Sequence, residues 1–260
     1  MWNYTHHLLA TGGYATLKPH LLTLFKALRT CGHGEQTVFM CDLAHAVARG
    51  FMQSYIPEGF YKPVKRIENV VRGGGGAGGP NSPNKGRAAT KLSNKNVAGK
   101  VAEPAAGDAM MASLKEACEI LEYSVSVTNG SNAQDVVPMD VRYQLIKSHV
   151  LCKGLMNQPL PKNYGHDSED KDSQGPMSRA LFVLEALLLH TKGVVEFPQC
   201  PSLADTIKMV QNAKWTDNML LLRVWSQLSV VAFHLNDTAT AMTCSDAALQ
   251  LKSAQVGLSK

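Results

Sequence analysis

The chain has 260 residues, of which 45% are apolar and 18% charged, and its formal net charge is +5. This balance is typical of globular proteins that build a sizeable core. No apolar run approaches the ~20 residues that a membrane-spanning helix needs, and the first residues lack the features of a secretory signal, so we expect no membrane insertion. The six cysteines are scattered and not clustered as in a small disulfide-rich scaffold, so we expect reduced thiols and a cytoplasmic protein.

Amphipathic helices are predicted throughout residues 1–70, which we assign to an N-terminal helical segment. In ATLKPHLLTLFKALRT the apolar residues recur at helical spacing, and the predicted buried face consists of Leu17, Leu21, Leu24, Phe25 and Leu28. The next run, EQTVFMCDLAHAVARGFMQSY, has a predicted inner face made of Phe39, Leu43, Ala46, Val47 and Phe51. A further helix is indicated at the start of the chain by Trp2, Leu8 and Leu9.

Residues 71–108 are predicted to form a disordered linker. Gly, Pro, Ser, Asn, Ala and Lys dominate them, and this composition offers nothing from which to build a core. The region from residue 62 to residue 100 is strongly basic, since its cations are opposed by Glu68 alone. These basic residues are Lys62, Lys65, Arg66, Arg72, Lys85, Arg87, Lys91, Lys95 and Lys100. That region has a charge of +8, so the rest of the chain sums to −3 and the basic character belongs to one stretch.

Helical patterns resume in residues 109–260, which we assign to a C-terminal helical segment. The clearest apolar stripe consists of Met110, Leu114, Ala117, Cys118, Leu121 and Val125. Further helices are predicted over residues 140–157 and 177–193, and three more are expected to begin at the capping residues Ser202, Asp217 and Asp237. The apolar run over residues 177–193 is expected to be well buried. About nine helices and no convincing strand make the predicted fold class all-α.

The last two predicted helices, VWSQLSVVAFHLNDTATAMTCSDAALQL, contain one tryptophan among small and apolar residues. Trp225 and Leu228 on the first helix, and Ala241 and Ala248 on the second, resemble the pattern of a tetratricopeptide repeat. The pattern is incomplete, since its usual Gly, Tyr and second-helix aromatic are replaced by Ser229, Ala232 and Ser245 and its closing Pro is missing. The resemblance implies antiparallel helix hairpins stacked as an irregular tetratricopeptide-like α-solenoid, interrupted by the linker. We expect Trp225 to lie in the core.

A second resemblance involves the first 30 residues, through Trp2, Leu8, Leu9, Gly12, Gly13, Tyr14, His20, Leu21, Leu22 and Leu24. This pattern is similar to a helix pair in the large cilia- and flagella-associated proteins of the axonemal central apparatus. The resemblance implies a non-enzymatic scaffold or protein-docking segment of the cytoskeleton, in the axoneme of a motile cilium or flagellum. Its implied partners are other proteins, among them axonemal microtubule-associated proteins and tubulin. The resemblance of the C-terminal hairpin to a tetratricopeptide repeat implies a groove that binds a partner. The residues expected on that face are Arg223, Ser226, Val230, Phe233 and His234.

Enzymatic and metal-binding alternatives find little support in the sequence. We find no G-x-S-x-G, no H-E-x-x-H and no G-x-G-x-x-G that follows a strand, so we expect a protein that is not an enzyme and has no cofactor. An all-α enzyme would instead need a buried polar cluster in a deep pocket. The spacing of Cys31, His33, Cys41 and His45 does not match a standard structural zinc site, so we expect no metal there.

The alternative function is a charge-driven adaptor, in which the basic linker binds nucleic acid or another anionic surface. The stretch between Val64 and Gly107 contains no aromatic residue on which bases could stack, which disfavours nucleic acid without removing it as a partner. Salt dependence separates the two functions, because binding through charge weakens steeply as salt rises.

Overall fold

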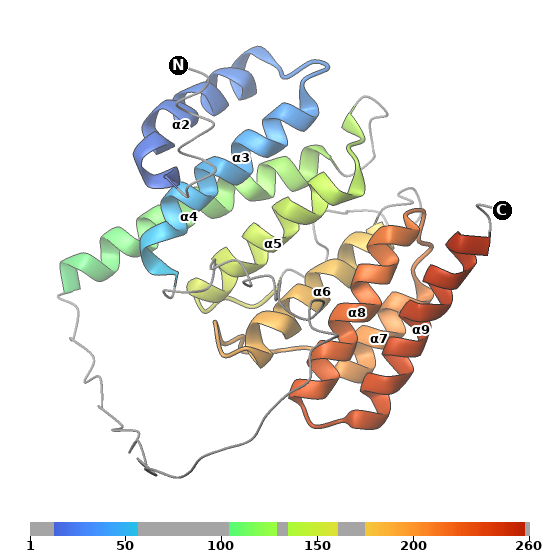
Figure 1. Cartoon of the computed structure of the whole chain (residues 1–260). Helices are drawn as coiled ribbons and strands as arrows, with labels where there is room; N and C mark the ends of the chain where they lie inside the picture. The colour runs from blue at the N-terminus through green and yellow to red at the C-terminus, as the bar shows by residue number, and fades with distance from the viewer. Residues whose placement is uncertain (1–12, 57–103, 129–134, 161–174, 258–260) are drawn as a thin grey trace, which may run out of the picture.

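The computed structural model describes residues 13–56, 104–128, 135–160 and 175–257, and within these ranges it is all-helical. These ranges contain eight α-helices, with one short 3-10 turn after the second of them. Figure 1 shows how they are arranged. The α-helices are α2 (Tyr14–Cys31), α3 (Thr37–Met52), α4 (Pro104–Val127), α5 (Met139–Leu155), α6 (Gly175–Thr191), α7 (Leu203–Asn212), α8 (Asn218–His234) and α9 (Thr238–Gly257). The predicted all-α class is thus confirmed for the described residues. The helix predicted at the start of the chain lies outside them.

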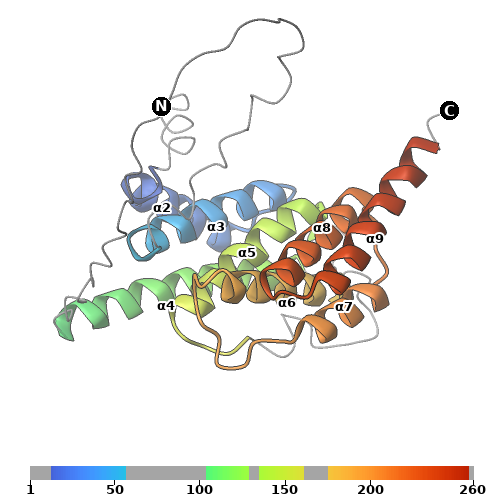
Figure 2. The same cartoon turned by 60° about the horizontal axis from the view of Figure 1, so that its bottom comes forward.

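Helices α2 and α3 form a hairpin at one end of the molecule, and the α8–α9 hairpin lies at the other end (Figures 1 and 2). The predicted inner faces of α2 and α3 are largely correct. Two predicted core residues are wrong, because Leu24 is 42% exposed and Phe39 is 38% exposed. Leu24 stands about 100° around the helix from the buried Phe25, at the edge of the stripe, and Phe39 lies in the first turn of α3.

The N-terminal hairpin shares one core with the helices that follow the predicted linker. Helix α3 packs along both α4 and α5, and Phe25 of α2 meets Tyr123 of α4 edge to face, with ring centroids 6.1 Å apart. Arg29 lies over the same ring, with its guanidinium carbon 4.5 Å from the centroid. The segments on either side of residues 71–108 therefore stabilise each other. Helix α4 begins at Pro104, inside the predicted linker, and the rest of that linker lies outside the described residues.

Helix α6 occupies the centre of the bundle, between α5 on one side and α7 and α8 on the other. From Met177 to Leu189 every residue except Arg179 is buried, which confirms the expected burial for this part of the run. Its last four residues, 190–193, are not buried. A helix that is apolar on all sides must be covered on all sides, so the neighbouring helices pack around α6. None of the helices within the described ranges is long and apolar enough to cross a membrane.

A buried arginine of α5 forms hydrogen bonds with residues of α6 and of the end of α4. Arg142 of α5 has no exposed surface, and its Nε donates to Ser178 Oγ of α6 over 2.8 Å. Its Nη1 donates to the carbonyl of Val125 over 3.0 Å, and also to the carbonyl and hydroxyl oxygens of Thr128 at the end of α4. These bonds satisfy carbonyl groups that the end of α4 would otherwise leave without donors.

The three predicted helix caps are confirmed. Ser202 Oγ accepts a hydrogen bond from the backbone N–H of Asp205 over 3.1 Å, at the start of α7. Asp217 Oδ1 accepts from the N–H groups of Met219 and Leu220, over 2.8 and 3.0 Å, and so begins α8. Asp237 similarly accepts from the backbone of α9, over 3.0 Å. Each cap satisfies N–H groups that have no partner inside their own helix.

The α8–α9 hairpin forms as expected, with Leu228 and Val231 of α8 buried against Cys244 of α9. Small residues let the two helices approach closely, and Ser229 Oγ lies 2.9 Å from the carbonyl oxygen of Ala241. The prediction that Trp225 is a core residue needs correction. Trp225 is only half-buried and packs against the edge of the core, because no helix in the described ranges covers its outer side.

Candidate functional site

The structure places the five predicted partner-binding residues on the exposed side of α8. Arg223, Ser226, Val230 and Phe233 are three, four and three residues apart, a spacing that puts them on one stripe of the helix. Phe233 is 67% exposed and Val230 is 46% exposed. Since apolar side chains of this size are usually covered, their exposure marks this stripe as a candidate contact surface.

Two of these residues line an apolar groove between α8 and α9, which we call the hairpin groove. It has a volume of about 590 Å³, and its walls and floor are formed by Ser229, Val230, Phe233, Thr238, Ala241, Met242, Ser245 and Asp246. The predicted set is therefore brought together only in part. His234 instead borders a different hollow, which it shares with His190 and Cys200. The contribution of α9 was not predicted from the sequence, although Met242 is 69% exposed and Leu249 is 59% exposed.

The nine basic residues between Lys62 and Lys100, which belong to the predicted linker and the segment just before it, lie outside the described residues. The structure therefore brings none of them into a described site. The charge-driven alternative remains a prediction from the sequence.

Cys31, His33, Cys41 and His45 do not converge on one site. His33 Nε2 lies 2.8 Å from Asp135 Oδ1, whereas His45 Nδ1 lies 2.8 Å from Ser148 Oγ of α5. Burial raises the pKa of the Cys41 thiol to about 12, so this sulfur stays protonated and is a poor metal ligand. Each histidine is thus occupied by a different partner.

A polar pocket of about 370 Å³ lies between α3, α5 and α6, and it is lined in part by His45, Lys147, Ser148 and Glu185. Burial lowers the pKa of His45 to about 4, so the ring is neutral at pH 7 and can exchange a hydrogen bond with Ser148. The ring also has a hydrogen bond to the backbone of Gln144, where a Ser–His–Asp triad would have a carboxylate. The described residues therefore supply a serine–histidine pair without the orienting acid.

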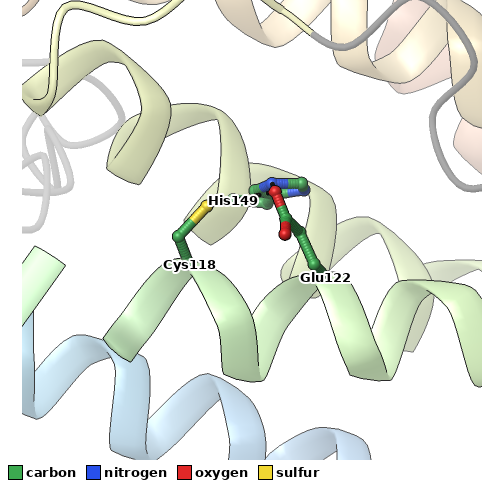
Figure 3. Close-up of side chains that lie close together, drawn as sticks. All are labelled: Cys118, Glu122 and His149. Carbon is green, nitrogen blue, oxygen red and sulfur yellow. Dashed lines mark hydrogen bonds and ion pairs between the residues drawn. The ribbon is translucent and has the colours of Figure 1, made fainter. Parts of the chain in front are cut away.

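A second cluster, which the sequence analysis did not identify, joins α4 to α5. Figure 3 shows Cys118 and Glu122, one turn apart on α4, with His149 of α5 beside them. Cys118 Sγ lies 3.4 Å from Glu122 Oε1, and the same oxygen lies 3.5 Å from His149 Nε2. Lys153 Nζ lies 2.7 Å from it. The sequence signal was available, because Cys118 and Glu122 are four residues apart on a predicted helix, but Cys118 was assigned only to the apolar stripe.

The charges in this cluster shift one another's ionisation. The neighbouring Cys152, His149 and Lys153 lower the pKa of Cys118, which favours a thiolate. His149 and Lys153 hold the pKa of Glu122 down at about 2, so this carboxylate is ionised at neutral pH. Burial disfavours the charged form of His149, but Cys118 and Glu122 outweigh it and raise its pKa. The cluster therefore holds two anionic groups and an imidazole within a few ångströms.

Comparison with known proteins does not indicate what these sites do. No protein-family model matches the chain, and no solved structure matches it. The resemblances to tetratricopeptide repeats and to axonemal proteins are therefore carried by the sequence patterns alone. The geometry of the hairpin groove and of the α4–α5 cluster is what remains to indicate a function.

Proposed function

We propose that this protein is a non-enzymatic docking scaffold whose hairpin groove binds an amphipathic helix of a partner protein. The observation that carries the proposal is the row of large apolar side chains exposed along the groove. Phe233 and Met242 are each about two-thirds exposed on opposite walls. Burying a side chain of this kind contributes about 1.5–3 kcal/mol, so a few such contacts favour a specific complex.

The shape of the groove favours a helix as its occupant. On α9, Met242, Ser245 and Leu249 are spaced by three and four residues, which places them on one face next to the Val230–Phe233 stripe of α8. The two helices thus form parallel walls above a floor of small residues, Ser229 and Ala241 among them. A helix with apolar residues at the i, i+3 or i+4, and i+7 positions fits between two such walls.

The groove also indicates the charge of its partner. Asp246 lines it, and Asp237 lies exposed beside Thr238 at the end where α9 begins. Both carboxylates are on the α9 side. We therefore assign the partner helix Lys or Arg residues next to its apolar anchors, because opposite charges at the rim set orientation and speed association.

The order of the helix contacts supports a scaffold built of stacked helix hairpins. Most helices pack on the next one along the chain, and α9 packs chiefly on α8. In an α-solenoid each hairpin packs on its neighbours, so the outer face of the last described hairpin is where a further helix would bind. The axonemal setting itself is inferred from the sequence resemblance, with tubulin or a microtubule-associated protein as the partner.

Selection of helical peptides tests the groove directly. We expect the intact chain to select, from a displayed library of helical peptides, sequences with apolar residues at i, i+3 or i+4, and i+7 and with basic flanks. Phe233→Ser and Met242→Ser should each weaken the selected peptides at least about tenfold in fluorescence anisotropy, since each removes apolar contact worth more than 1.4 kcal/mol.

Phe39→Ser is the matched control, because Phe39 is also an exposed phenylalanine but lies on α3. Peptides that bind equally well to both groove variants would contradict the proposed site. If the intact chain forms a dimer in analytical ultracentrifugation and Phe233→Ser abolishes it, the occupant is a second copy and not a partner helix.

Microtubule co-sedimentation tests the axonemal setting. We expect the intact chain to pellet with microtubules at moderate salt, and a variant with its nine basic linker residues changed to Gln to pellet as well. Pelleting that disappears in this variant or with rising salt would support the charge-driven alternative instead, because release of bound counterions makes such binding strongly salt-dependent. The absence of pelleting from both proteins would remove the support for tubulin as a partner.

A further inference from the structure

The cluster that joins α4 to α5 has the composition of a transition-metal site. Cys118 and Glu122 come from α4 and His149 from α5, and their ligand atoms all lie within 4.8 Å of one another (Figure 3). Thiolate, imidazole and carboxylate are the three ligand types that zinc uses in proteins. We propose that this cluster binds Zn²⁺ through Cys118, Glu122 and His149, and that the metal links α4 to α5.

The distances in the cluster fit a tetrahedral zinc ion. Zinc lies about 2.3 Å from thiolate sulfur and about 2.0–2.2 Å from imidazole nitrogen or carboxylate oxygen, so two of its ligands stand roughly 3.3–3.8 Å apart. Cys118 Sγ and Glu122 Oε1 are 3.4 Å apart, and Glu122 Oε1 and His149 Nε2 are 3.5 Å apart. Two edges of the tetrahedron are thus already formed.

His149 supplies an independent observation. Its side chain is only 4% exposed, yet neither ring nitrogen has a hydrogen-bond partner with acceptable geometry. Leaving a buried polar group without a partner costs about 1–3 kcal/mol, so such groups are uncommon and call for an explanation. Nε2 faces Glu122 and Cys118, and a metal ion placed between them would accept its lone pair.

Cys152 lies beside the three ligands but is not one of them. It follows His149 by three residues on α5 and is fully buried. Its sulfur donates to the carbonyl of Leu114 over 3.2 Å, and the neighbouring Cys118 together with burial raises its pKa, so it stays a thiol. The thiolate and imidazole ligands of Cys118 and His149 favour zinc over magnesium or calcium. With three protein ligands, a tetrahedral zinc ion keeps its fourth position for water.

Lys153 forms an ion pair with the Glu122 carboxylate. Its ammonium lies 2.7 Å from Glu122 Oε1, and its side chain is 15% exposed, so it can move toward solvent when a metal binds. A bound metal must displace this ammonium from the oxygen or share the carboxylate with it. Removing the lysine charge should therefore strengthen metal binding. This expectation distinguishes a metal site from a cluster that only holds the helices together by hydrogen bonds.

Cobalt titration of the full, tag-free chain, reduced and freed of metal, tests the proposal. We expect one equivalent of Co²⁺ to give the visible bands of tetrahedral cobalt together with a sulfur-to-cobalt charge-transfer band, and Zn²⁺ to displace it. Cys118→Ser and His149→Gln should each weaken binding by at least about 100-fold, since each removes a ligand and not only a supporting contact. Lys153→Gln should increase the affinity.

Cys41→Ser and Cys244→Ser are the matched controls, because both remove a buried thiol elsewhere in the chain, and both should bind cobalt as the natural sequence does. A cobalt complex without the charge-transfer band, or with the same affinity in Cys118→Ser and His149→Gln, would overturn the proposal. If circular dichroism shows that either of these ligand variants does not fold, the cobalt affinity of Lys153→Gln tests the proposal instead. An unchanged or lower affinity in that variant would also overturn the proposal.

Discussion

Arg142→Ala is expected to lower the free energy of unfolding by about 3–5 kcal/mol, because it breaks a buried polar network. The substitution removes donors from the carbonyls of Val125 and Thr128 and from the hydroxyl of Ser178, all of which stay buried. Each buried acceptor left without a donor costs about 1–3 kcal/mol, and the lost side chain also leaves a cavity. The effect should extend to α4, α5 and α6 together, since the arginine contacts all three.

Urea denaturation of the intact protein, followed by circular dichroism, measures this loss. Arg223→Ala is the control, because that arginine is exposed on α8 and its removal should change the stability by less than about 0.5 kcal/mol. Arg142→Lys should give an intermediate loss, since a lysine keeps the charge but cannot form the fork of hydrogen bonds. An Arg142→Ala protein as stable as the Arg223→Ala protein would show that the network contributes nothing.

Phe182→Ala and Phe233→Ala are expected to differ strongly in stability although they remove the same side chain. Phe182 of α6 is fully buried and meets the His149 ring edge to face, with centroids 5.4 Å apart. Its truncation should cost about 3–5 kcal/mol through lost burial and the cavity left behind. Phe233, on the wall of the hairpin groove, is 67% exposed, so its truncation should cost less than about 1 kcal/mol.

Thermal denaturation of the two variants beside the natural sequence checks this pair. The larger loss corresponds to a fall in Tm of roughly 10 °C for a chain of this size. A large loss in Phe233→Ala would mean that its side chain supports the fold and is not available to a partner. Equal, small losses in both variants would contradict the central position of α6.

Interactions between close neighbours in the chain were predictable from the sequence. The caps at Ser202, Asp217 and Asp237 formed as expected, because a capping side chain bonds to a backbone group two or three residues away. The apolar period also predicted the helices and the burial of α6. The apolar period did not predict that Leu24 and Phe39, at the edges of their stripes, are exposed. Burial at the edge of a stripe depends on where the neighbouring helix ends.

The α4–α5 cluster likewise combines one contact that the sequence predicts with another that it does not. The sequence places Cys118 and Glu122 on one face of a helix, because residues four apart are adjacent in any α-helix. It does not place His149 beside them, since that contact depends on how α5 packs against α4. The same holds for the groove, where Val230 and Phe233 were predicted but Met242 was not, because it comes from a different helix.

The sequence by itself therefore determined the helical class, the caps, the buried character of α6 and the stripe of α8, all of which follow from helical periodicity and local hydrogen bonds. Only the tertiary structure decided that α2 and α3 share a core with α4 and α5, that α8 and α9 enclose a groove, and that His149 lies against Cys118 and Glu122. The physical reason is that helix packing depends on side chains far apart in the chain, whose complementarity no local pattern records.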